Sequence, residues 1–456
     1  MPSHVIDMIM LKNNFGTEQM RQVWSDENRL QKHFDVEIAL AKAEGELGLI
    51  PKEAAQLIAQ AKTDDVSIEE LAANMAKVKH SLMPTITALQ ERSGEGGEFV
   101  HYGATTQDIV DTGTMLQLKE AHQIIRAELI DVAAGLARLA KEHRLTPIAG
   151  RSHGMQGLPT TFGFKMAVVL SEVLRHLTRL DEVSGRVFVG NISGAVGTYA
   201  SFGPEGIEVE KRSLELLGLG APEIVWHSSR DRLAEYASVL GLISGTLGKL
   251  GNEFYNLMRT EIDEIEEPFT KGKVGSSTMP HKRNPAAFEG IASLTRPVLQ
   301  NVSLIQHSLI VEHERDAMSW RAEWIAMPEI CIYLSSQLAS TKGVLDGLIV
   351  KKENMLRNLD LLGGLLLSER VMFAISDKAG KQTAHHIIYE LSMASFEEKV
   401  PFKQKLAENE TVKELLSEEE LNELFNYETY LGLAPEKVDE VLTNYYNSPY
   451  AKTEGK

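Results

Sequence analysis

Apolar side chains recur every three or four positions along most of the chain, which is the spacing of one face of an α-helix. The longest such seam begins at Asp231 and continues for about seven turns, in the manner of a coiled coil. Its members are Leu233, Tyr236, Leu240, Ile243, Leu247, Leu250, Phe254 and Leu257. The pattern predicts a long helix that buries one face along its whole length.

Gly241, Gly245 and Gly248 form a second line along the same predicted helix. A glycine inside a helix costs about 1 kcal/mol relative to alanine, so a repeated line of glycines needs a structural reason. Close approach of another helix is the natural one. We therefore expect this face to pack tightly, and we expect bundling of such helices between subunits.

Helical spacing extends over nearly all of the remaining chain. A second long helix is predicted from about Gln107 to His143, and Thr105 with Asp108 resembles a capping box at its start. Further helices are predicted at 25–48, 51–61, 67–92, 161–188, 285–311, 330–348, 352–358, 364–377, 383–399 and 417–425. No strand-rich section is evident. The pattern predicts an all-α protein with three consecutive helical domains, at 1–106, 107–350 and 351–456, the middle one a bundle of long helices.

Composition sets limits on the partners. The 47 basic and 64 acidic residues give a formal charge of 47 − 64 = −17, which argues against binding to nucleic acid or to an anionic membrane. No apolar run approaches the roughly 20 residues of a membrane-spanning helix. We expect a cytoplasmic protein. The single cysteine, Cys331, follows an isoleucine in an apolar run and is expected to be a buried, unreactive side chain.

Three segments are rich in small polar and ionisable residues, although their flanks are apolar helix. They lie at 101–108, 150–163 and 271–285. Each ends at, or continues into, a predicted helix N-terminus, where free amides and the helix dipole favour anions. Three such segments together predict one composite polar site.

The third segment carries the most information. It contains Ser276, Ser277, Lys282 and Asn284 among glycines and prolines, and its four cationic side chains stand out in an acidic chain. A negatively charged ligand is therefore expected. Neither a Gly-x-Ser-x-Gly elbow nor a dinucleotide or P-loop glycine motif is present in a suitable context, and no metal or cofactor is indicated.

The run Gly-Ser-Ser-Thr-Met-Pro-His-Lys-Arg-Asn-Pro at 275–285 resembles the signature loop of the fumarase/aspartase superfamily. The other two polar segments resemble the remaining signature regions in order and approximate spacing. The resemblance implies a three-domain helical subunit whose central helices form a twenty-helix core in a homotetramer. It also implies active sites drawn from three subunits, and anti elimination that releases fumarate from a small dicarboxylate substrate, or the reverse addition.

The resemblance also implies roles for individual residues. Ser276 matches the catalytic base, and His153 matches the histidine that protonates the leaving group in related lyases. His80 matches a second functional histidine of adenylosuccinate lyases over a short stretch only, so a purely structural role remains equally open. The residues that would bind substrate carboxylates, or lie beside them, are Thr105, Thr106, Ser152, Lys282 and Asn284.

Different segments of the chain resemble different branches of the superfamily. Several segments resemble adenylosuccinate lyases, but Trp320-Arg321-Ala322-Glu323-Trp324 resembles the carboxymuconate cycloisomerases, and Trp324 stands where a cationic nucleotide contact is expected. His153 favours elimination over lactonisation. We expect a fumarate-releasing lyase acting on a succinyl compound by C–N cleavage. The alternatives are a cycloisomerase, adenylosuccinate lyase itself, or a catalytically silent helical assembly protein, which the intact site residues disfavour.

Overall fold

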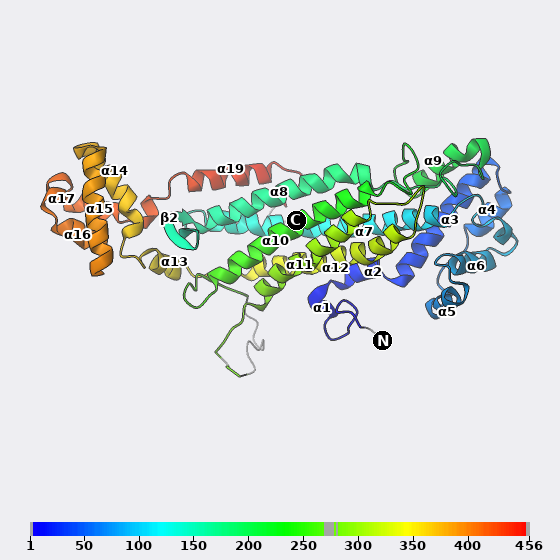
Figure 1. Cartoon of the computed structure of the whole chain (residues 1–456), viewed down its shortest axis with the longest axis horizontal. Helices are drawn as coiled ribbons and strands as arrows, with labels where there is room; N and C mark the ends of the chain where they lie inside the picture. The colour runs from blue at the N-terminus through cyan, green and yellow to red at the C-terminus, as the bar shows by residue number, and fades with distance from the viewer. Residues whose placement is uncertain (1–2, 269–277, 280, 453–456) are drawn as a thin grey trace. The chain divides into compact units, whose positions relative to one another are not determined.

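The computed structural model describes residues 3–268, 278–279 and 281–452. Long helices dominate it (Figure 1), and the all-α prediction is confirmed. The longest helices include α7 (Thr106–Glu142), α8 (Phe162–Val187), α10 (Asp231–Leu257), α11 (Ala286–His307) and α12 (Met318–Gly347). Among the described residues, no helix is both long and apolar enough to cross a membrane.

Further helices precede and follow these. Before α7 lie α1 (Lys12–Phe15), α2 (Glu18–Val23), α3 (Asp26–Leu47), α4 (Lys52–Ile58), α5 (Ile68–Val78) and α6 (Met83–Arg92). Between α8 and α10 lies α9 (Gly206–Leu216). After α12 come α13 (Lys352–Leu359), α14 (Ser368–Ala379), α15 (Lys381–Glu398), α16 (Phe402–Glu408), α17 (Glu410–Leu415), α18 (Glu418–Leu424) and α19 (Ala434–Tyr446).

The helix predicted at 67–92 is two helices, and the break between them positions a site residue. Lys79 ends α5 in the left-handed conformation, at φ 58°, and Pro84 occupies the first turn of α6. A left-handed residue stops a helix and proline favours a new start, so the pair separates α5 from α6. His80 lies in the short connection between them.

The chain forms two compact units. The first comprises Met1–Leu129, Arg175–Gly248 and Gly290–Ser340, and the second comprises Ile130–Leu174, Lys249–Glu289 and Thr341–Lys456. All five boundaries between these segments fall inside long helices, so the units are packing groups rather than consecutive stretches of chain. The division of the sequence into domains at 1–106, 107–350 and 351–456 stays a prediction.

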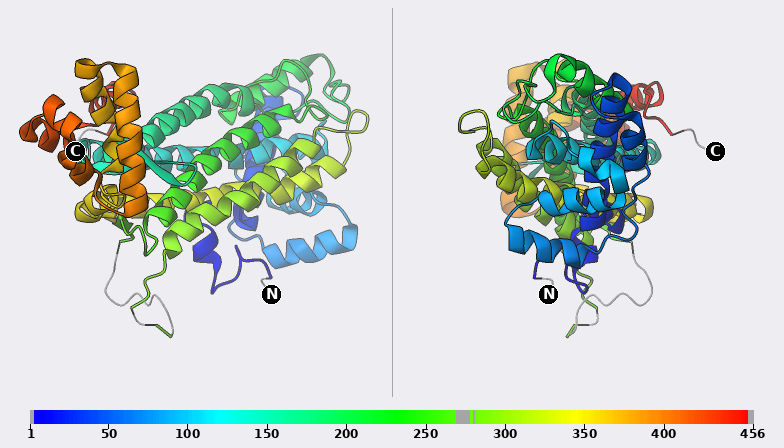
Figure 2. Two further views of the ribbon diagram at one scale, coloured as in Figure 1. Left: turned by 60° about the vertical axis from the view of Figure 1, so that its left-hand side comes forward. Right: turned by 90° about the vertical axis from the view of Figure 1, so that its right-hand side faces the viewer.

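Within the first unit, parts of the long helices lie side by side (Figures 1 and 2). The predicted seam of α10 is buried there, with Tyr236, Leu240 and Ile243 fully covered. A Cβ on Gly241 would lie 3.1 Å from Val302 of α11, and one on Gly248 would lie 2.1 Å from Thr295. Close helix approach is therefore confirmed at these two glycines, and the helix that approaches is α11 of the same chain.

The second unit contains strands that the sequence pattern did not indicate. β1 (Pro147–Ser152) and β2 (Met155–Thr161) form an antiparallel hairpin, and β3 (Ile265–Glu266) pairs with β4 (Ile349–Val350). The sequence pattern predicted only that the polar segment at 150–163 continues into a helix, so the hairpin adds two strands to that prediction. Ladder hydrogen bonds satisfy its backbone, and Ala149 packs with Leu359 and Leu366.

Candidate active site

Asp108 organises the first polar segment in the first unit. Its carboxylate is fully buried and accepts backbone N–H bonds from Thr105 at 2.9 Å, Ser193 at 3.1 Å and Gly194 at 2.9 Å. His227 Nε2 also lies 2.9 Å from it. The bond to Thr105 is the carboxylate half of the predicted capping box. These contacts fix the turn that leads into α7.

The Thr105 hydroxyl is used differently from a helix cap. It accepts a 2.6 Å hydrogen bond from Arg315 Nη1, which ties the start of α7 to the segment before α12. In that segment Asp316 accepts backbone N–H bonds from Glu312 at 2.7 Å, Met318 at 2.6 Å and Ser319 at 3.1 Å. Partial burial raises the pKa of Asp316, but these amide bonds together lower it by more than burial raises it. The net shift of this pKa is downward.

A cavity of about 430 Å³ opens beside His80, and we call it the His80 cavity. It is lined by the α5–α6 connection from Lys79 to Ser81, by Thr106, and by residues between Arg315 and Trp324. The sequence-predicted residues His80 and Thr106 therefore share one cavity, and Thr105 is bonded to a residue that lines it. The first unit thus brings this part of the predicted site together.

The hydrogen bonds of His80 define its tautomer. Nδ1 accepts backbone N–H bonds from Leu82 at 3.2 Å and Met83 at 3.1 Å, at the start of α6. A nitrogen that accepts cannot carry a hydrogen, so Nε2 bears the hydrogen in the neutral ring. Among the described residues Nε2 has no hydrogen-bond partner. One nitrogen of His80 is structural, and the other is a donor available to a ligand.

A buried ion-pair network supports the same end of α12, and sequence reasoning did not find it. Arg230 is 2% exposed and donates to Asp111 at 2.8 and 3.0 Å and to Glu323 at 2.8 Å. Burial lowers the pKa of Arg230, but the two carboxylates outweigh it and raise the pKa overall. Because Glu323 precedes Trp324, the network fixes the helix turn that carries the indole.

His101, in the same polar segment as Thr105, forms an ion pair with Glu37 of α3. Its Nδ1 lies 2.6 Å from Glu37 Oε1, and Glu37 is buried. Burial lowers the pKa of His101, but Glu37 and then Asp108 raise it to give a net increase. The sequence placed His101 in a polar segment but gave no sign of its partner, because the two residues are 64 positions apart.

The second unit carries His153 at the tip of the β1–β2 hairpin. His153 and Gly154 have φ of 52° and 79°, the positive pair that a two-residue type I′ turn requires. A non-glycine residue in this conformation costs about 1–2 kcal/mol, so the hairpin must hold His153 in place. The imidazole is exposed, and Ser152 beside it is also exposed.

A bidentate ion pair anchors the hairpin near its tip. Arg151 donates to Glu264 at 2.9 and 2.7 Å, and the Glu264 carboxylate is fully buried. Asn358 Nδ2 donates to the same carboxylate at 2.9 Å, and Gln156 Nε2 donates to the Asn358 carbonyl at 2.8 Å. Both strands of the hairpin are therefore fastened to one buried cluster.

The third polar segment is described only in part. Ser276, the predicted base, lies outside the described residues. Lys282 is exposed and Asn284 is half-buried at the start of α11. Glu266 of β3 forms ion pairs with Arg283 and with Lys351. Partial burial raises the pKa of Glu266, but these cations lower it overall. Glu264 and Glu266 thus anchor two predicted site segments. Glu264, just before β3, binds the β1–β2 hairpin, and Glu266 in β3 binds Arg283 near the end of the third polar segment.

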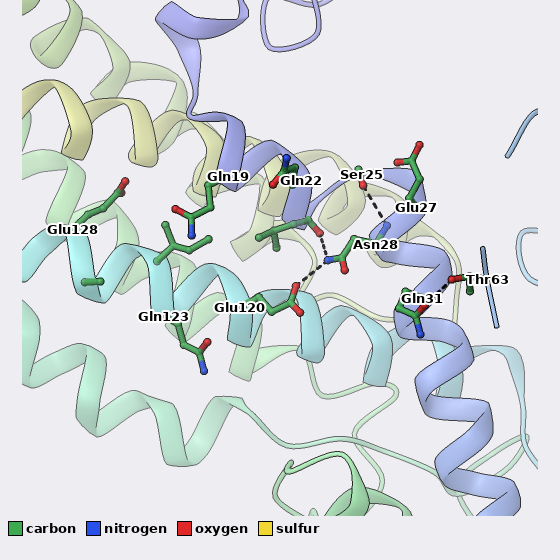
Figure 3. A pocket seen from close by; sticks show the side chains of 13 residues that line it. Gln19, Gln22, Ser25, Glu27, Asn28, Gln31, Thr63, Glu120, Gln123 and Glu128 are labelled. Carbon is green, nitrogen blue, oxygen red and sulfur yellow. Dashed lines mark hydrogen bonds between the residues drawn. The ribbon is translucent and has the colours of Figure 1, made fainter. Parts of the chain in front are cut away.

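Another cavity in the first unit, of about 790 Å³, has the wrong chemistry for an anion. Figure 3 shows its lining of glutamine, asparagine and glutamate side chains, including Glu27, Glu120 and Glu128. No lysine, arginine or histidine of the described chain lines this cavity, and Glu120 accepts a 2.9 Å hydrogen bond from Asn28. A dicarboxylate would meet acidic side chains there, so the His80 cavity is the better candidate.

Comparison with known families and proteins shows the family of the chain. A family described as "Lyase" matches residues 13–299, and one described as "Adenylosuccinate lyase C-terminus" matches 364–441. The chain is 60% identical to N-acetyl-S-(2-succino)cysteine lyase of Enterococcus italicus, over 99% of this chain and 100% of that protein. It is 59% identical to the protein of the same name from Dickeya dadantii, over 97% and 98%.

Two more distant matches are proteins named for other activities. It is 44% identical to adenylosuccinate lyase of Methanocaldococcus jannaschii, over 96% of both chains. The crystal structure of 3-carboxy-cis,cis-muconate lactonizing enzyme from Pseudomonas putida matches with a TM-score of 0.91 at 37% identity, over 94% of this chain and 97% of that one. The chain therefore belongs to the fumarase/aspartase superfamily and is a fumarate-releasing lyase.

Proposed function

We propose that this protein cleaves the C–S bond of N-acetyl-S-(2-succino)cysteine and releases fumarate and N-acetylcysteine. The observation that carries the proposal is the near-full-length identity of about 60% to two lyases of that name from two organisms. The sequence pattern favoured a C–N bond at the cleavage point. The proposal replaces that bond by a thioether and keeps elimination with fumarate release.

The reaction begins at the methylene carbon of the succinyl group. Ser276, as an alkoxide, removes a proton from this carbon, and the electron pair moves into the adjacent carboxylate to give an aci-carboxylate. Lys282 and Asn284 stabilise that doubly negative group, because preorganised donors act best where charge develops. The electron pair then returns to form the double bond as the C–S bond breaks, and sulfur leaves with the bonding pair.

Because the leaving atom is sulfur, the elimination depends less on protonation by His153. A thiol has a pKa of about 8.5, so a thiolate is a tolerable leaving group near neutral pH. His153 gives a proton to the departing thiolate, and Ser276 later returns the proton that it took. His153 therefore contributes less to this elimination than it would to the loss of an amine. The exposed position of its ring on a rigid hairpin tip suits this role.

The site is completed in a homotetramer that places the three polar segments of different subunits together, in the cytoplasm. The anchoring of the segments supports this arrangement, because each is fixed by its own network. Asp108 holds the first segment, Glu264 holds the second, and Glu266 holds the end of the third. The turn before α7 and the β1–β2 hairpin can then keep their shape while they face a neighbouring subunit.

A substrate panel tests the proposal. The purified protein is given N-acetyl-S-(2-succino)cysteine, adenylosuccinate or 3-carboxy-cis,cis-muconate, and fumarate or lactone formation is followed by ultraviolet absorbance. We expect efficient turnover of the thioether alone. Comparable turnover of adenylosuccinate would contradict the proposal, as would exclusive formation of a lactone from the muconate.

A further inference from the structure

The charges around the His80 cavity favour an anionic ligand, such as one that carries a carboxylate. Lys79, Arg315 and Arg321 line it, and the acidic residue that lines it is Asp316. Asp316 already accepts three backbone N–H bonds, so little of its capacity is left to neutralise the cations. A bound carboxylate would lower the net positive charge of this lining.

The three cations are not equivalent. Arg315 donates to the Thr105 hydroxyl, whereas Arg321 makes no ion pair or hydrogen bond with any described residue. Arg321 lies on α12 one residue after Trp320 and three before Trp324, so the guanidinium shares a helix face with the second indole. Its planar fork matches a carboxylate. The Lys79 ammonium also has no partner among the described residues, but it lacks this planar fork, so Arg321 is the better match for a carboxylate in the cavity.

Two indoles form the apolar part of the wall. The rings of Trp320 and Trp324 are 6.1 Å apart and tilted by 44°. Trp324 also lines a second cavity of about 250 Å³, in which Arg29 and His33 lie. The Arg29 guanidinium is 4.7 Å from the centre of the Trp324 ring. Trp324 is thus a partition between the two cavities, and its cation–π contact keeps it in place.

We propose that the His80 cavity binds the leaving-group half of the substrate, an N-acylated amino acid, with its carboxylate on Arg321 and its acyl group against the indoles. Trp324 limits the size of the acyl group, because its indole separates the His80 cavity from the second cavity. The Nε2–H of His80 is available to the acyl oxygen. This assignment rests on the proposed function, because it takes the leaving group from that reaction.

The first experiment compares N-acetyl-S-(2-succino)cysteine with the analogue whose cysteine carboxylate is a carboxamide. The wild-type protein is expected to prefer the carboxylate by roughly 10- to 100-fold in kcat/KM, and Arg321→Gln is expected to remove the preference. The ratio of two substrates in one preparation does not depend on the folded fraction. Lys77→Gln, an exposed change on α5 outside the cavity, should keep the preference. An unchanged preference in Arg321→Gln would overturn the assignment.

The second experiment tests the partition. Trp324→Ala joins the two cavities, whereas Trp320→Ala enlarges only the His80 cavity, because Trp320 does not line the smaller one. We expect Trp324→Ala to shift the ratio of N-benzoyl to N-acetyl substrate turnover by at least about 10-fold, and Trp320→Ala to shift it less. Equal shifts of this turnover ratio in the two variants would show that Trp324 does not separate the two cavities.

A binding measurement separates this inference from the proposed function. N-acetylcysteine and N-acetylcysteinamide are titrated calorimetrically into the wild type and Arg321→Gln. If the thioether is not turned over but the acid binds more tightly than the amide in the wild type only, the reaction proposal fails and the cavity assignment stands. If the thioether is turned over but both compounds bind equally to both proteins, the cavity assignment fails alone.

Discussion

Arg151, which lies two residues before the exposed His153, forms two parallel hydrogen bonds with the buried carboxylate of Glu264. This pair fastens the hairpin whose tip holds His153 in a left-handed conformation. Glu264 is also bonded to Asn358. The position of the proposed acid therefore depends on a contact that lies outside the reacting groups, which makes Arg151 a positioning residue.

Arg151→Lys should lower kcat by about 3-fold, less than the loss of His153 itself, with a smaller change in KM, because a lysine keeps the charge but loses the bidentate geometry. The matched control is Arg144→Lys, which breaks the bidentate Arg144–Asp439 pair on the exposed surface of the same unit. The control should leave kcat unchanged. Equal kcat values in wild type and Arg151→Lys would show that the ion pair does not position the acid.

The two proposed proton-transfer residues should differ in their importance. Ser276→Ala removes the base and should lower kcat by about 1,000-fold or more. His153→Gln should lower it only about 10-fold on the thioether, because a thiolate leaves with less need of an acid. Steady-state kinetics on both variants checks this order. A loss in His153→Gln as large as that in Ser276→Ala would mean that the leaving group must be protonated.

Glu44 should make folding stability depend on pH. It is fully buried on α3, and burial, aided by Glu37, raises its pKa from 4.5 to about 9. The folded protein then keeps a proton that the unfolded chain loses above its own pKa, so stability falls as pH rises between these two values. Glu44→Gln should flatten this dependence and stabilise the protein by roughly 2–3 kcal/mol at pH 7.

Denaturant unfolding at several pH values measures the effect of Glu44→Gln. The control is Glu53→Gln, which changes an exposed carboxyl on α4 and should leave the pH dependence unaltered. Parallel stability curves for wild type and Glu44→Gln would contradict the protonated state assigned to Glu44.

The buried network around Arg230 should contribute strongly to folding. Arg230→Met leaves Asp111 and Glu323 as buried charges without their cation and should cost about 3–5 kcal/mol. Arg186→Met breaks the exposed Arg186–Glu235 pair and should cost at most about 1 kcal/mol. Urea denaturation of both variants gives the comparison. A similarly small loss of unfolding free energy in both variants would show that the buried network contributes no more than an exposed ion pair.

Helices were predictable because their signal is local. The apolar seam from Leu233 to Leu257 matches α10, and the capping residues Thr105 and Asp108 mark the start of α7. The β1–β2 hairpin was missed because its strands carry glycines, polar residues and a proline, and its stability comes from contacts distant in sequence. The Arg151–Glu264 bond, for example, spans 113 positions.

The site was predictable only at the level of residue types. The polar segments identified Thr106, and a short local match identified His80, but nothing local to His80 indicates that α6 amides bind its Nδ1 or that Trp324 lies at the same cavity. Cys331, in contrast, could be judged from its apolar neighbours, and it is fully buried. Contacts between separate elements depend on how the helices pack, and a single sequence does not specify that packing.

Parallel detection of two products tests the central claim most directly. N-acetyl-S-(2-succino)cysteine is incubated with the wild type and with Ser276→Ala, fumarate is followed by absorbance, and free thiol is followed with a thiol-reactive dye. We predict equal amounts of fumarate and thiol with the wild type, and neither above background with Ser276→Ala, which should keep the native oligomeric state. Thiol release without fumarate, or full turnover by Ser276→Ala, would contradict the account.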